Sequence, residues 1–406
     1  MRVLLVGSGG REHALAWKLA SSASLDQLHA APGSPGIAAL ATCHPVAADD
    51  ADGLLALARF LDADLVVVGP EAPLVAGVAD ALRHSGISVF GPSAAAARIE
   101  GSKRFAKDVM AAAGVPTARL LSTPRVPCVL KADGLAAGKG VVVCRTEDEL
   151  RVGLEAARNF GDGVLVEELL EGPEVSVFAV CDGADVVVLA PATDFKRAYE
   201  GDAGPNTGGM GSFAPVAALD DELLDEVVDG TVRPILAELA RRGTPFVGTL
   251  FAGLMLTADG ARVLEYNCRF GDPETQSVVP LVDGDFLAVL AGAAQGSLAG
   301  AAVGRAEGAA VTVVLAAGDY PSSGDRGTPI EGVSDAEASG ALVFHAGTAL
   351  DGGRLVTSGG RLLGVTAKGP TLADARARAY DAADLIRIPG ARRREDIALV
   401  AAAGGK

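Results

Sequence analysis

Short apolar runs alternate with amphipathic, alanine-rich segments along the first hundred residues of the chain. The runs at 2–6, 65–68 and 87–90 have the length and the branched residues of β-strands, and residues 13–19 repeat their apolar positions with a helical period. Strands that alternate with helices predict a doubly wound parallel sheet. These strands run into turns that contain glycine, and ligands of open α/β sheets bind at the carboxyl ends of strands.

The pattern becomes rich in β-strands after a long helical stretch that begins near residue 92 and carries Lys103. Residues 116–117 indicate the start of a strand, and alternating apolar positions continue up to a hairpin turn at 182–183. We expect a small β-rich lid, over residues 118–184, that closes over a nucleotide. The alternative is a rigid accessory hairpin that binds no ligand.

A second hairpin is predicted where Asp259-Gly260 separates two alternating runs between residues 251 and 269. Side chains alternate between the two faces of a strand, so the second run sorts its residues into two sets. One face carries Glu265, Asn267 and Arg269, and the other carries Leu264, Tyr266 and Cys268. Two oxygen ligands beside a guanidinium suit a magnesium-bound triphosphate and a second anion. The alternative is the solvated outer face of an edge strand.

The last hundred residues combine several strands with one long helix. Runs at 311–316, 341–344 and 361–366 have the pattern of strands, and residues 372–386 have that of a helix. This order predicts a C-terminal α+β domain, so the whole chain is expected to combine α/β and α+β domains. Three arginines at 392–394 precede two acidic residues, which is more typical of a solvated turn than of a nucleic-acid patch.

Length and composition narrow the class of protein. A chain of 406 residues with 49% hydrophobic content is long enough for roughly two to four domains. No apolar stretch reaches about 18 residues, and Met1 leads directly into a strand pattern, so we expect a cytoplasmic protein that does not enter a membrane. The formal net charge of -16 opposes non-specific binding of nucleic acid but permits local pockets for anions.

Cysteine and histidine usage bears on disulfides and metals. The five cysteines contain no Cys-x-x-Cys pair. Their odd number and scattered spacing indicate buried, reduced thiols rather than a disulfide framework or a zinc site. The five histidines are also scattered, which argues against a histidine-based metal cluster.

The segment 131–140 has the most specific polar chemistry in the chain. It places two lysines and three glycines between the predicted strands 129–130 and 141–143. Glycines let backbone N–H groups approach an anion that the lysines neutralise, so the segment suits a polyphosphate. The alternative is a mobile surface hairpin, because the Gly-x-x-x-x-Gly-Lys-Ser/Thr motif is absent.

The turn after the first strand, Gly9-Gly10-Arg11-Glu12, matches a dinucleotide fingerprint only in part. Glu12 stands where the third glycine is required, and the second strand ends in Ala-Ala-Pro without an acidic residue. A helix N-terminus flanked by Arg11 favours a single phosphate instead, with tight packing of helix on strand as the alternative. An NAD-dependent dehydrogenase is therefore disfavoured.

Two further polar segments, 194–197 and 204–211, lie in a stretch that is too rich in glycine for a helix or a strand. Long irregular stretches inside a domain are usually functional or disordered. The mixture of Asp, Lys, Arg, Asn and Thr in this stretch favours a binding loop over a linker.

Three motifs together carry a resemblance to a known family: KADGLAAGKGV at 131–141, GPNTGGMG at 204–211 and NCRFGDPE at 267–274. With further matching pieces along nearly the whole chain, the sequence resembles the phosphoribosylamine-glycine ligases of the ATP-grasp superfamily. The resemblance implies three domains. They are a phosphoribosylamine-binding α/β domain over 1–101, an ATP-grasp domain over 102–305 that includes the lid, and a C-terminal α+β domain over 306–406.

The resemblance also implies a reaction. Such an ATP-dependent ligase joins glycine to 5-phosphoribosylamine through glycyl phosphate, giving glycinamide ribonucleotide, ADP and phosphate in de novo purine biosynthesis. It uses ATP and magnesium, with manganese as an alternative ion, and no obligatory protein partner. The reaction needs cations that spread phosphoryl charge but no enzyme nucleophile. This agrees with a sequence that shows no Ser-His-Asp or Cys-His arrangement.

Residue roles follow from the resemblance at the matching positions. The residues expected at ATP are Lys103, Lys131, Lys139, Glu167, Glu168 and Glu174, the lysines at the phosphates and the glutamates around adenine and ribose. The expected metal ligands are Glu265 and Asn267. The residues expected at phosphoribosylamine and glycine are Gly10, Arg11, Glu12, Pro70, Glu71, Asn206, Thr207, Gly208, Gly209 and Arg269. The residues expected to act in catalysis are Arg269, Lys139 and Asp194.

The sequence departs from the family pattern at two places. Residues 118–130 leave no room for the extra helix usually found there, so we expect a trimmed lid, and Phe195 replaces a residue that is frequently polar. Two rival functions stay open: an ATP-grasp ligase or carboxylase with other substrates, and a protein that binds nucleotide without turnover. Glycine-dependent release of ADP distinguishes them from the expected ligase.

Overall fold

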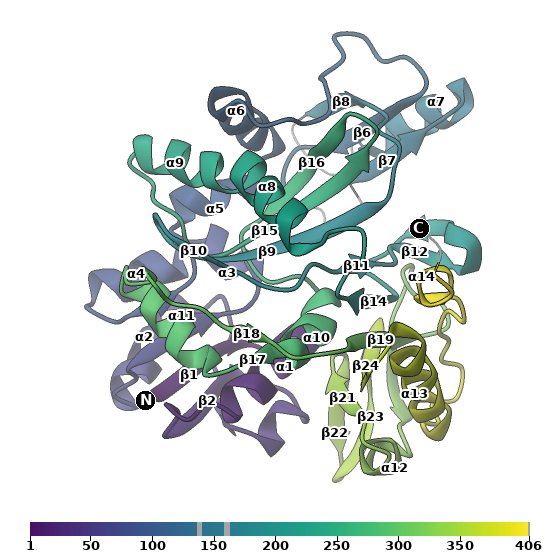
Figure 1. The fold of residues 1–406 in the computed structure, drawn as a ribbon. Helices are drawn as coiled ribbons and strands as arrows, with labels where there is room; N and C mark the ends of the chain where they lie inside the picture. Colours follow the sequence, from purple (N-terminus) through teal and green to yellow (C-terminus); the bar gives the residue numbers. More distant parts are fainter. Residues whose placement is uncertain (136–139, 158–162, 405–406) are drawn as a thin grey trace.

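The computed structural model describes residues 1–135, 140–157 and 163–404. Its N-terminal part is a parallel sheet in the order β3-β2-β1-β4-β5, which confirms the predicted doubly wound sheet (Figure 1). The strands are β1 (Arg2–Gly7), β2 (Gln27–Pro32), β3 (Thr42–Cys43), β4 (Leu65–Val68) and β5 (Val89–Phe90). The helices are α1 (Gly10–Ala20), η1 (Ile37–Ala39), α2 (Ala51–Phe60), α3 (Glu71–Val75), α4 (Val78–His84) and α5 (Ala94–Gly101).

The apolar run of β1 explains why helices cover both faces of this sheet. Leu4 and Val6 lie in one buried cluster, and Val3 and Leu5 lie in another. A strand that is buried on both faces needs apolar residues at successive positions, as parallel sheets usually have.

The long helical pattern after residue 92 is divided into two helices, α5 and α6 (Lys103–Ala113). Ser102 separates them because its backbone is extended and its side chain accepts a hydrogen bond from the Phe105 N–H, which caps α6. The prediction that a strand starts at residues 116–117 is wrong, because Thr117 forms only an isolated bridge with Val263.

The lid is a small antiparallel sheet in the order β7-β6-β8, with α7 packed against it. Its elements are β6 (Cys128–Ala132), β7 (Val141–Cys144), α7 (Glu147–Ala157) and β8 (Val164–Glu168). The prediction that the lid extends to residue 184 is wrong, because β9 (Glu174–Asp182) pairs with β15 in another sheet. The seven inner residues of β9 are all buried, so this strand requires cover on both faces. The predicted absence of a helix before Lys131 is confirmed.

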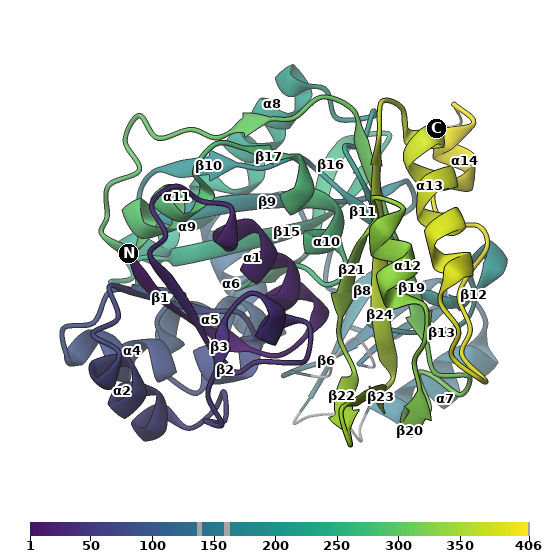
Figure 2. The ribbon, with the colours of Figure 1, turned by 90° about the horizontal axis from the view of Figure 1, so that it is seen from below.

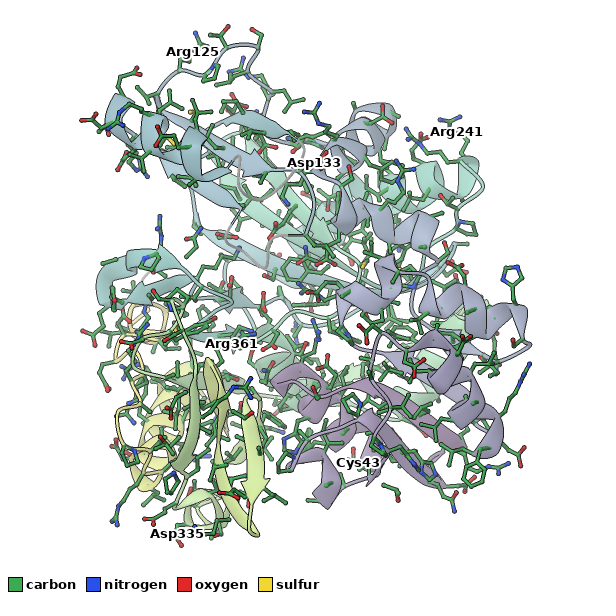
Figure 3. The ribbon with its side chains drawn as sticks, turned by 180° about the vertical axis from the view of Figure 1, so that it is seen from behind. Cys43, Arg125, Asp133, Arg241, Asp335 and Arg361 are labelled. Atoms are coloured by element: carbon green, nitrogen blue, oxygen red, sulfur yellow. The ribbon has the colours of Figure 1, made fainter. Side chains whose placement is uncertain are left out.

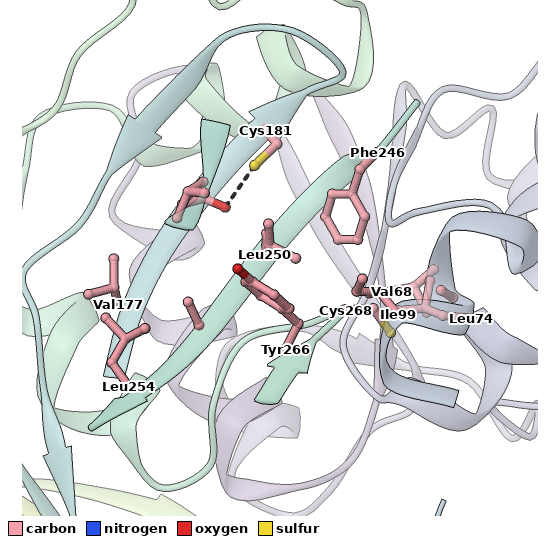
Figure 4. Close-up of a cluster of buried hydrophobic side chains, with 14 of the residues drawn as sticks. Val68, Leu74, Ile99, Val177, Cys181, Phe246, Leu250, Leu254, Tyr266 and Cys268 are labelled. Atoms are coloured by element: carbon pink, nitrogen blue, oxygen red, sulfur yellow. Dashed lines mark hydrogen bonds between the residues drawn. The ribbon is translucent and has the colours of Figure 1, made fainter. Parts of the chain in front are cut away.

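The central sheet has the order β10-β9-β15-β16. Its other strands are β10 (Val186–Val188), β15 (Val247–Thr257) and β16 (Gly260–Asn267), and the last two form the predicted hairpin. Leu250 and Tyr266 belong to the buried cluster formed with α8 (Asp221–Thr231) and α9 (Arg233–Arg241), as Figure 4 shows for the strand side. Phe251 lies in the cluster of α11 (Phe286–Ala294). The predicted alternation is confirmed from Glu265 onward, because Tyr266 and Cys268 are buried in the core. It is wrong at Leu264, because an irregular pairing opposite Gly253 and Leu254 shifts the register and buries Val263 instead.

The C-terminal part is built on an antiparallel sheet in the order β11-β14-β19-β24-β21 (Figure 2). Two of these strands, β11 (Thr193–Asp194) and β14 (Gly211–Ala214), come from the middle of the chain. The others are β19 (Ala309–Ala316), β21 (Leu342–His345) and β24 (Arg361–Gly369). A smaller sheet combines β20 (Asp325–Pro329), β22 (Thr348–Asp351) and β23 (Arg354–Gly359), and the helices are α12 (Val333–Ala338), α13 (Leu372–Leu385) and α14 (Leu399–Ala402). The predicted α+β character of this part is confirmed.

Short elements connect the central sheet to the C-terminal sheet. They are α10 (Glu274–Val278), η3 (Val279–Leu281), β17 (Val282–Asp283) and β18 (Gly304–Arg305). Helix α10 packs against both α1 and β14, so it joins all three parts of the chain.

The stretch from 194 to 211 contains strands, which corrects the prediction that its glycines prevent regular structure. It forms β11, β12 (Arg197–Tyr199), η2 (Glu200–Asp202), β13 (Ala203–Asn206) and the start of β14. Strands β12 and β13 pair around a tight turn in which Gly201 and Asp202 have positive φ. Glycine therefore makes the turn between strands here, as it does in many hairpins.

The prediction of a solvated turn at 392–394 is also wrong, because the Arg394 side chain is 2% exposed and forms ion pairs. The prediction of reduced thiols is confirmed: the five cysteines are free, and all except Cys43 are buried. Within the described ranges of the chain, every helix is too short or too polar to cross a membrane.

Candidate active site

Two lysines share one buried glutamate where the lid meets α6. The Glu167 side chain is 3% exposed, and its two oxygens lie 2.9 Å from Lys107 Nζ and 2.9 Å from Lys131 Nζ. Lys131 also donates to the Leu264 carbonyl at 2.8 Å. An ammonium has three donors, so Lys131 keeps one for an anion. Lys107 was not predicted, although it stands one helical turn after Lys103 and thus on the same face of α6.

Lys103 is the first residue of α6 and lies beside the loop that follows β6. Its Nζ donates to the Gly134 carbonyl at 2.9 Å, and its backbone N–H donates to Asp133 Oδ1 at 2.7 Å. Figure 3 places Asp133 between the lid and the body of the molecule. Burial lowers the pKa of Lys103, and Glu265 opposes this effect. Lys139, expected at the same phosphates, lies outside the described residues.

The other glutamates expected around adenine and ribose are also engaged in ion pairs. Glu168 accepts from Arg119 Nη2 at 2.6 Å and lies 3.8 Å from Arg262. Glu174 pairs with Lys196 across the central site. Glu167 and Glu168 leave β8 on opposite faces, as their separate partners show. Only Glu168 and Glu174 therefore retain surface that a nucleoside can contact, since Glu167 is enclosed.

Glu265 is surrounded by cations from separate parts of the chain. Burial tends to raise its pKa, but Lys196, Lys131 and Lys103 lower it below the ordinary value, so the carboxylate stays ionised. Asn267 donates its Nδ2 to the Tyr266 carbonyl at 3.0 Å, which leaves Oδ1 as an acceptor. One carboxylate and one amide oxygen are hard ligands that suit magnesium when phosphate and water complete its shell. This donor set fits the expected metal.

Asp194, the last residue of β11, and Lys196, two residues later, both lie near Glu174 and Glu265. Asp194 Oδ1 lies 3.9 Å from Lys196 Nζ. Burial raises the pKa of Asp194 well above its ordinary value, an effect that Lys196 opposes. Burial also raises the pKa of Glu274, which was not among the expected site residues. The acidic side chains of Asp194, Glu174, Glu265 and Glu274 are thus brought together around Lys196.

The first strand-to-helix turn meets Arg269 through a buried ion-pair network. Arg11 Nε lies 2.6 Å from Glu12 Oε1, and Arg11 Nη1 lies 3.7 Å from Glu71 Oε2. Arg269 Nε lies 3.2 Å from the same Glu71 oxygen, and its Nη2 lies 3.1 Å from Glu100 Oε1. The expected substrate residues of the N-terminal part and the expected catalytic Arg269 are therefore adjacent.

Glu12 has a structural task in this turn. Its Oε2 accepts from the Gly9 N–H at 2.7 Å, and the side chain is nearly enclosed. A Cβ at Gly7 or Gly69 would lie within 2.5 Å of Glu12 side-chain atoms, so both positions require glycine. Glu12 fills the space beneath the turn, whereas Pro70 precedes α3 at the neighbouring strand end.

The glycine-rich loop after β13 is held by residues of the C-terminal part. Thr207 donates from Oγ1 to the Lys196 carbonyl at 2.9 Å, and Gly209 donates to Thr207 Oγ1 at 3.0 Å. Arg361 donates to the carbonyls of Gly208 and Asp272 at 2.6 and 2.8 Å, and lies near the middle of the molecule in Figure 3.

Further contacts fix the ends of this loop. Asn206 Nδ2 donates to the Val141 carbonyl of the lid at 3.4 Å, and Gly208 donates to the Tyr320 hydroxyl at 2.8 Å. Gly10 lies against Gln276, whose Nε2 would be 2.8 Å from a Cβ at Gly10. Arg361 and Tyr320 were not predicted as site residues. The motif Ser-Gly-Gly-Arg at 358–361 is the only sequence signal that pointed to Arg361.

The assembled site is a set of cations and acids without a nucleophile–base pair among the residues described. Lysines from α6, β6 and the 194–211 segment approach Glu265, and Arg269 joins them to the first turn. Such a site can hold a polyphosphate and a second anion and can stabilise negative charge that develops between them.

Models of one family match most of the chain. Residues 1–100 match the N domain of phosphoribosylglycinamide synthetase, residues 101–275 match its ATP-grasp (A) domain, and residues 310–400 match its C domain.

Individual relatives agree with these matches. The phosphoribosylamine–glycine ligase of Streptomyces coelicolor is 52% identical, over 99% of this chain and 100% of the relative. The protein of the same name from Leifsonia xyli is 48% identical, over 98% and 99%. The crystal structure of phosphoribosylamine–glycine ligase from Thermotoga maritima superposes with a TM-score of 0.85 at 33% identity, covering 98% of this chain and 100% of that one.

A more distant structure shares the fold alone. The biotin carboxylase domain of 2-oxoglutarate carboxylase from Hydrogenobacter thermophilus has a TM-score of 0.67 at 19% identity, covering 96% of this chain and 91% of that one.

Proposed function

The chain belongs to the phosphoribosylglycinamide synthetase family, and we propose the roles of its residues in the ATP-dependent ligation of glycine to 5-phosphoribosylamine. The enzyme is a phosphoribosylamine–glycine ligase of purine biosynthesis. The observation that carries the residue assignment is the ionised Glu265 among Lys103, Lys131, Lys196 and Arg269. These cations come from α6, the lid, the 194–211 segment and the extension of β16, and Arg269 contacts Glu71, which Arg11 of the first turn also contacts. We infer that they mark where the substrates meet.

The lysines of α6 and the lid bind the phosphates of ATP. Lys131 has an unused donor, and Lys103 stands at the same lid loop. The family resemblance assigns the same role to Lys139, which lies outside the described residues. Glu168, at the end of β8, and Glu174, at the start of β9, contact the nucleoside. Glu167 orients Lys131 through their buried ion pair. The enclosed position of Glu167 supports this division.

Glu265 and Asn267 hold magnesium, for which manganese can substitute. Bound there, the ion supplies positive charge that lowers the cost of moving the γ-phosphoryl group. Glu265 is suited to this task because the surrounding lysines keep it ionised, and Asn267 offers a neutral oxygen two residues away on the same face.

The second half of the site binds phosphoribosylamine and glycine. The turn at Gly10 and Arg11, with Pro70 and Glu71 at the next strand, receives the phosphorylated sugar. The loop at 206–209 and Arg269 border the glycine. The support is the Arg11–Glu71–Arg269 network, which joins these two regions directly.

The chemistry needs two transfers. The glycine carboxylate oxygen bonds to the γ-phosphorus as the bond to the ADP oxygen breaks, which gives glycyl phosphate. The amine of phosphoribosylamine then attacks the acyl carbon, phosphate leaves, and the amine loses a proton. In this proposal Arg269 stabilises the oxyanion at the acyl carbon, and Asp194, whose Oδ1 lies 3.9 Å from Lys196 Nζ, accepts the proton.

We propose that the chain acts on three small molecules: glycine, 5-phosphoribosylamine and ATP. The domains are 1–101, 102–305 and 306–406, with strands β11 and β14 of the middle domain completing the C-terminal sheet. Its five free cysteines support a reducing compartment, and we assign the enzyme to the cytoplasm.

The test is ADP release with ATP and magnesium while glycine and freshly generated phosphoribosylamine are omitted in turn. Release that requires both substrates is the expected result. Release with bicarbonate in place of glycine would favour a carboxylase, and ATP binding without release under any combination would favour a non-catalytic protein.

A further inference from the structure

The arginine segment (residues 392–394) leaves its own domain and contacts the 194–211 segment. Hydrogen bonds join the two regions at several points, including Gly201 N–H to Asp396 Oδ2 at 2.8 Å.

Arg394 makes the most enclosed of these contacts. Its Nη1 lies 2.9 Å from Asp202 Oδ1 and donates to the Arg197 carbonyl at 3.1 Å. Its guanidinium carbon lies 5.1 Å from the centre of the Phe195 ring. Asp396 accepts from Nε and Nη2, both at 2.7 Å, so the buried charge is compensated from two sides.

The residues that Arg394 contacts flank Lys196. Phe195 and Arg197 are its chain neighbours, and successive residues of an extended segment present opposite faces. Lys196 points the other way, to Glu174 and Asp194. Its carbonyl is also bonded by the Thr207 N–H at 2.7 Å, so the backbone at Lys196 is held on both sides.

The neighbouring arginines show that this is a specific arrangement. Arg392 also reaches the segment, donating to the Ala198 carbonyl. Arg393 turns back to its own domain, where it pairs with Asp384 at 2.7 Å and Glu395 at 2.8 Å. Consecutive arginines thus differ in whether they touch the segment that carries the site residues.

We propose that Arg394 is a positioning residue for the reaction: it holds the backbone at 195–202 so that Lys196 and Asp194 stay in place beside Glu265. The kinetic part of this inference rests on the proposed function. Arg394 does not touch the reacting groups, and its effect passes through Phe195, Arg197 and Asp202. A planar, two-sided donor is required there, because lysine cannot bond Asp202, Asp396 and the carbonyl in one plane.

The experiment compares Arg394→Lys, Asp202→Asn and the control Arg393→Ala in the full-length enzyme. Hydrogen exchange at the amides of Phe195, Thr207 and Met210 reports directly on the segment, since each is bonded within it. We expect faster exchange in Arg394→Lys and Asp202→Asn and unchanged exchange in Arg393→Ala. Asp202 is exposed, so its replacement tests the contact without opening a cavity.

Steady-state kinetics is the second measurement. We expect kcat to fall about tenfold or more in Arg394→Lys while KM for ATP changes less than about twofold, because misplaced groups slow the chemical step. Asp202→Asn is expected to change in the same direction, and Arg393→Ala is expected to match the wild type.

Equal exchange in all variants, or an equal loss of kcat in Arg393→Ala, would overturn the proposal. A wild-type enzyme that lacks glycine-dependent ADP release would instead refute the proposed function, and the exchange measurement would still decide whether Arg394 positions the segment.

Discussion

Glu167 on β8 lies diagonally across from Lys131 on β6, with its Oε2 2.9 Å from Lys131 Nζ. The other oxygen of Glu167 holds Lys107 of α6 at the same distance, so one carboxylate connects the lid to the body of the enzyme. Lys131, for which we propose a contact with ATP, is therefore oriented by a buried anion rather than by solvent. Its position depends on a carboxylate that is enclosed by the protein.

Glu167→Gln should weaken ATP binding and reduce stability together. The substitution leaves Lys107 and Lys131 without a buried counterion, which should lower the free energy of unfolding by about 3 kcal/mol. KM for ATP should rise about tenfold, since Lys131 loses its orientation. Denaturant unfolding and ATP titration measure the two effects. The control is Glu171→Gln, whose exposed pair with Arg145 at 3.8 Å should contribute less than about 0.5 kcal/mol.

Glu265 and its neighbour Tyr266 should respond very differently to substitution. Glu265→Gln keeps the size of the side chain but removes the charge at the metal position, so turnover should fall about 100-fold or more. Tyr266→Phe acts in the core, where the hydroxyl donates to the Thr231 carbonyl. It should lower stability by about 1 to 2 kcal/mol and leave turnover within about twofold of wild type.

Magnesium-dependent ADP formation and thermal unfolding of both variants distinguish these effects. Near-normal turnover in Glu265→Gln, or a larger kinetic loss in Tyr266→Phe, would show that the metal does not bind at the face of β16 that carries Glu265. A raised magnesium requirement in Glu265→Gln alone is the expected signature of a lost metal ligand.

Local patterns were sufficient to predict elements that are fixed by their own residues. Asp259-Gly260 determines a turn, and the alternation after it places Tyr266 in the core. The extent of the lid could not be predicted in this way. Strand β9 belongs to the central sheet because it pairs with β15, about seventy residues later in the chain. The strands at 197–199 and 203–206 were missed because their glycines make the turns of a hairpin instead of breaking it.

The same distinction applies to the site. Motifs indicated Glu265, Asn267 and Arg269, which share one strand and its extension. Lys107 and Arg361 were missed because their partners, Glu167 and Gly208, are far away in sequence and only the fold brings them together. Arg394 was interpreted as solvated because charged residues in a row usually are; its compensation by Asp202 required the tertiary structure.

Arg11→Lys should impair the use of phosphoribosylamine more than the use of ATP. A lysine keeps the charge beside Glu12 and Glu71 but loses the fork that also reaches the Phe270 carbonyl at 3.1 Å. KM for phosphoribosylamine should rise about tenfold, and the calorimetric Kd for ATP should change less than about twofold. Lysine is used because alanine would leave two buried carboxylates without a partner.

Arg2→Lys is a suitable control for this variant, because Arg2 lies at the start of β1, where its side chain forms an exposed pair with Asp62 at 3.3 Å. It should leave both constants unchanged. Parallel losses of ATP and phosphoribosylamine binding in Arg11→Lys would show that the turn supports the whole site and does not receive the sugar phosphate.

His13 should make the enzyme sensitive to mild acid. It lies at the contact between α1 and β21, where its Nδ1 accepts from the His345 N–H at 2.8 Å. Burial, with a smaller effect of His345, lowers the pKa of His13 to about 3, and burial lowers that of His345 to about 4, from the ordinary 6.5. A histidine that is neutral only in the folded state contributes stability above pH 6.5, and this contribution is lost as the pH falls toward these values.

Thermal unfolding at pH 7.0 and 4.5 tests this expectation. The Tm of the wild type should fall more over this interval than the Tm of His13→Asn, whose amide oxygen can accept the same hydrogen bond without titrating. His84→Asn, at an exposed position of α4, should behave like the wild type, because it leaves the contact between α1 and β21 unchanged. An equal loss of Tm in wild type and His13→Asn would assign the acid sensitivity to His345 or the carboxylates, which all variants share.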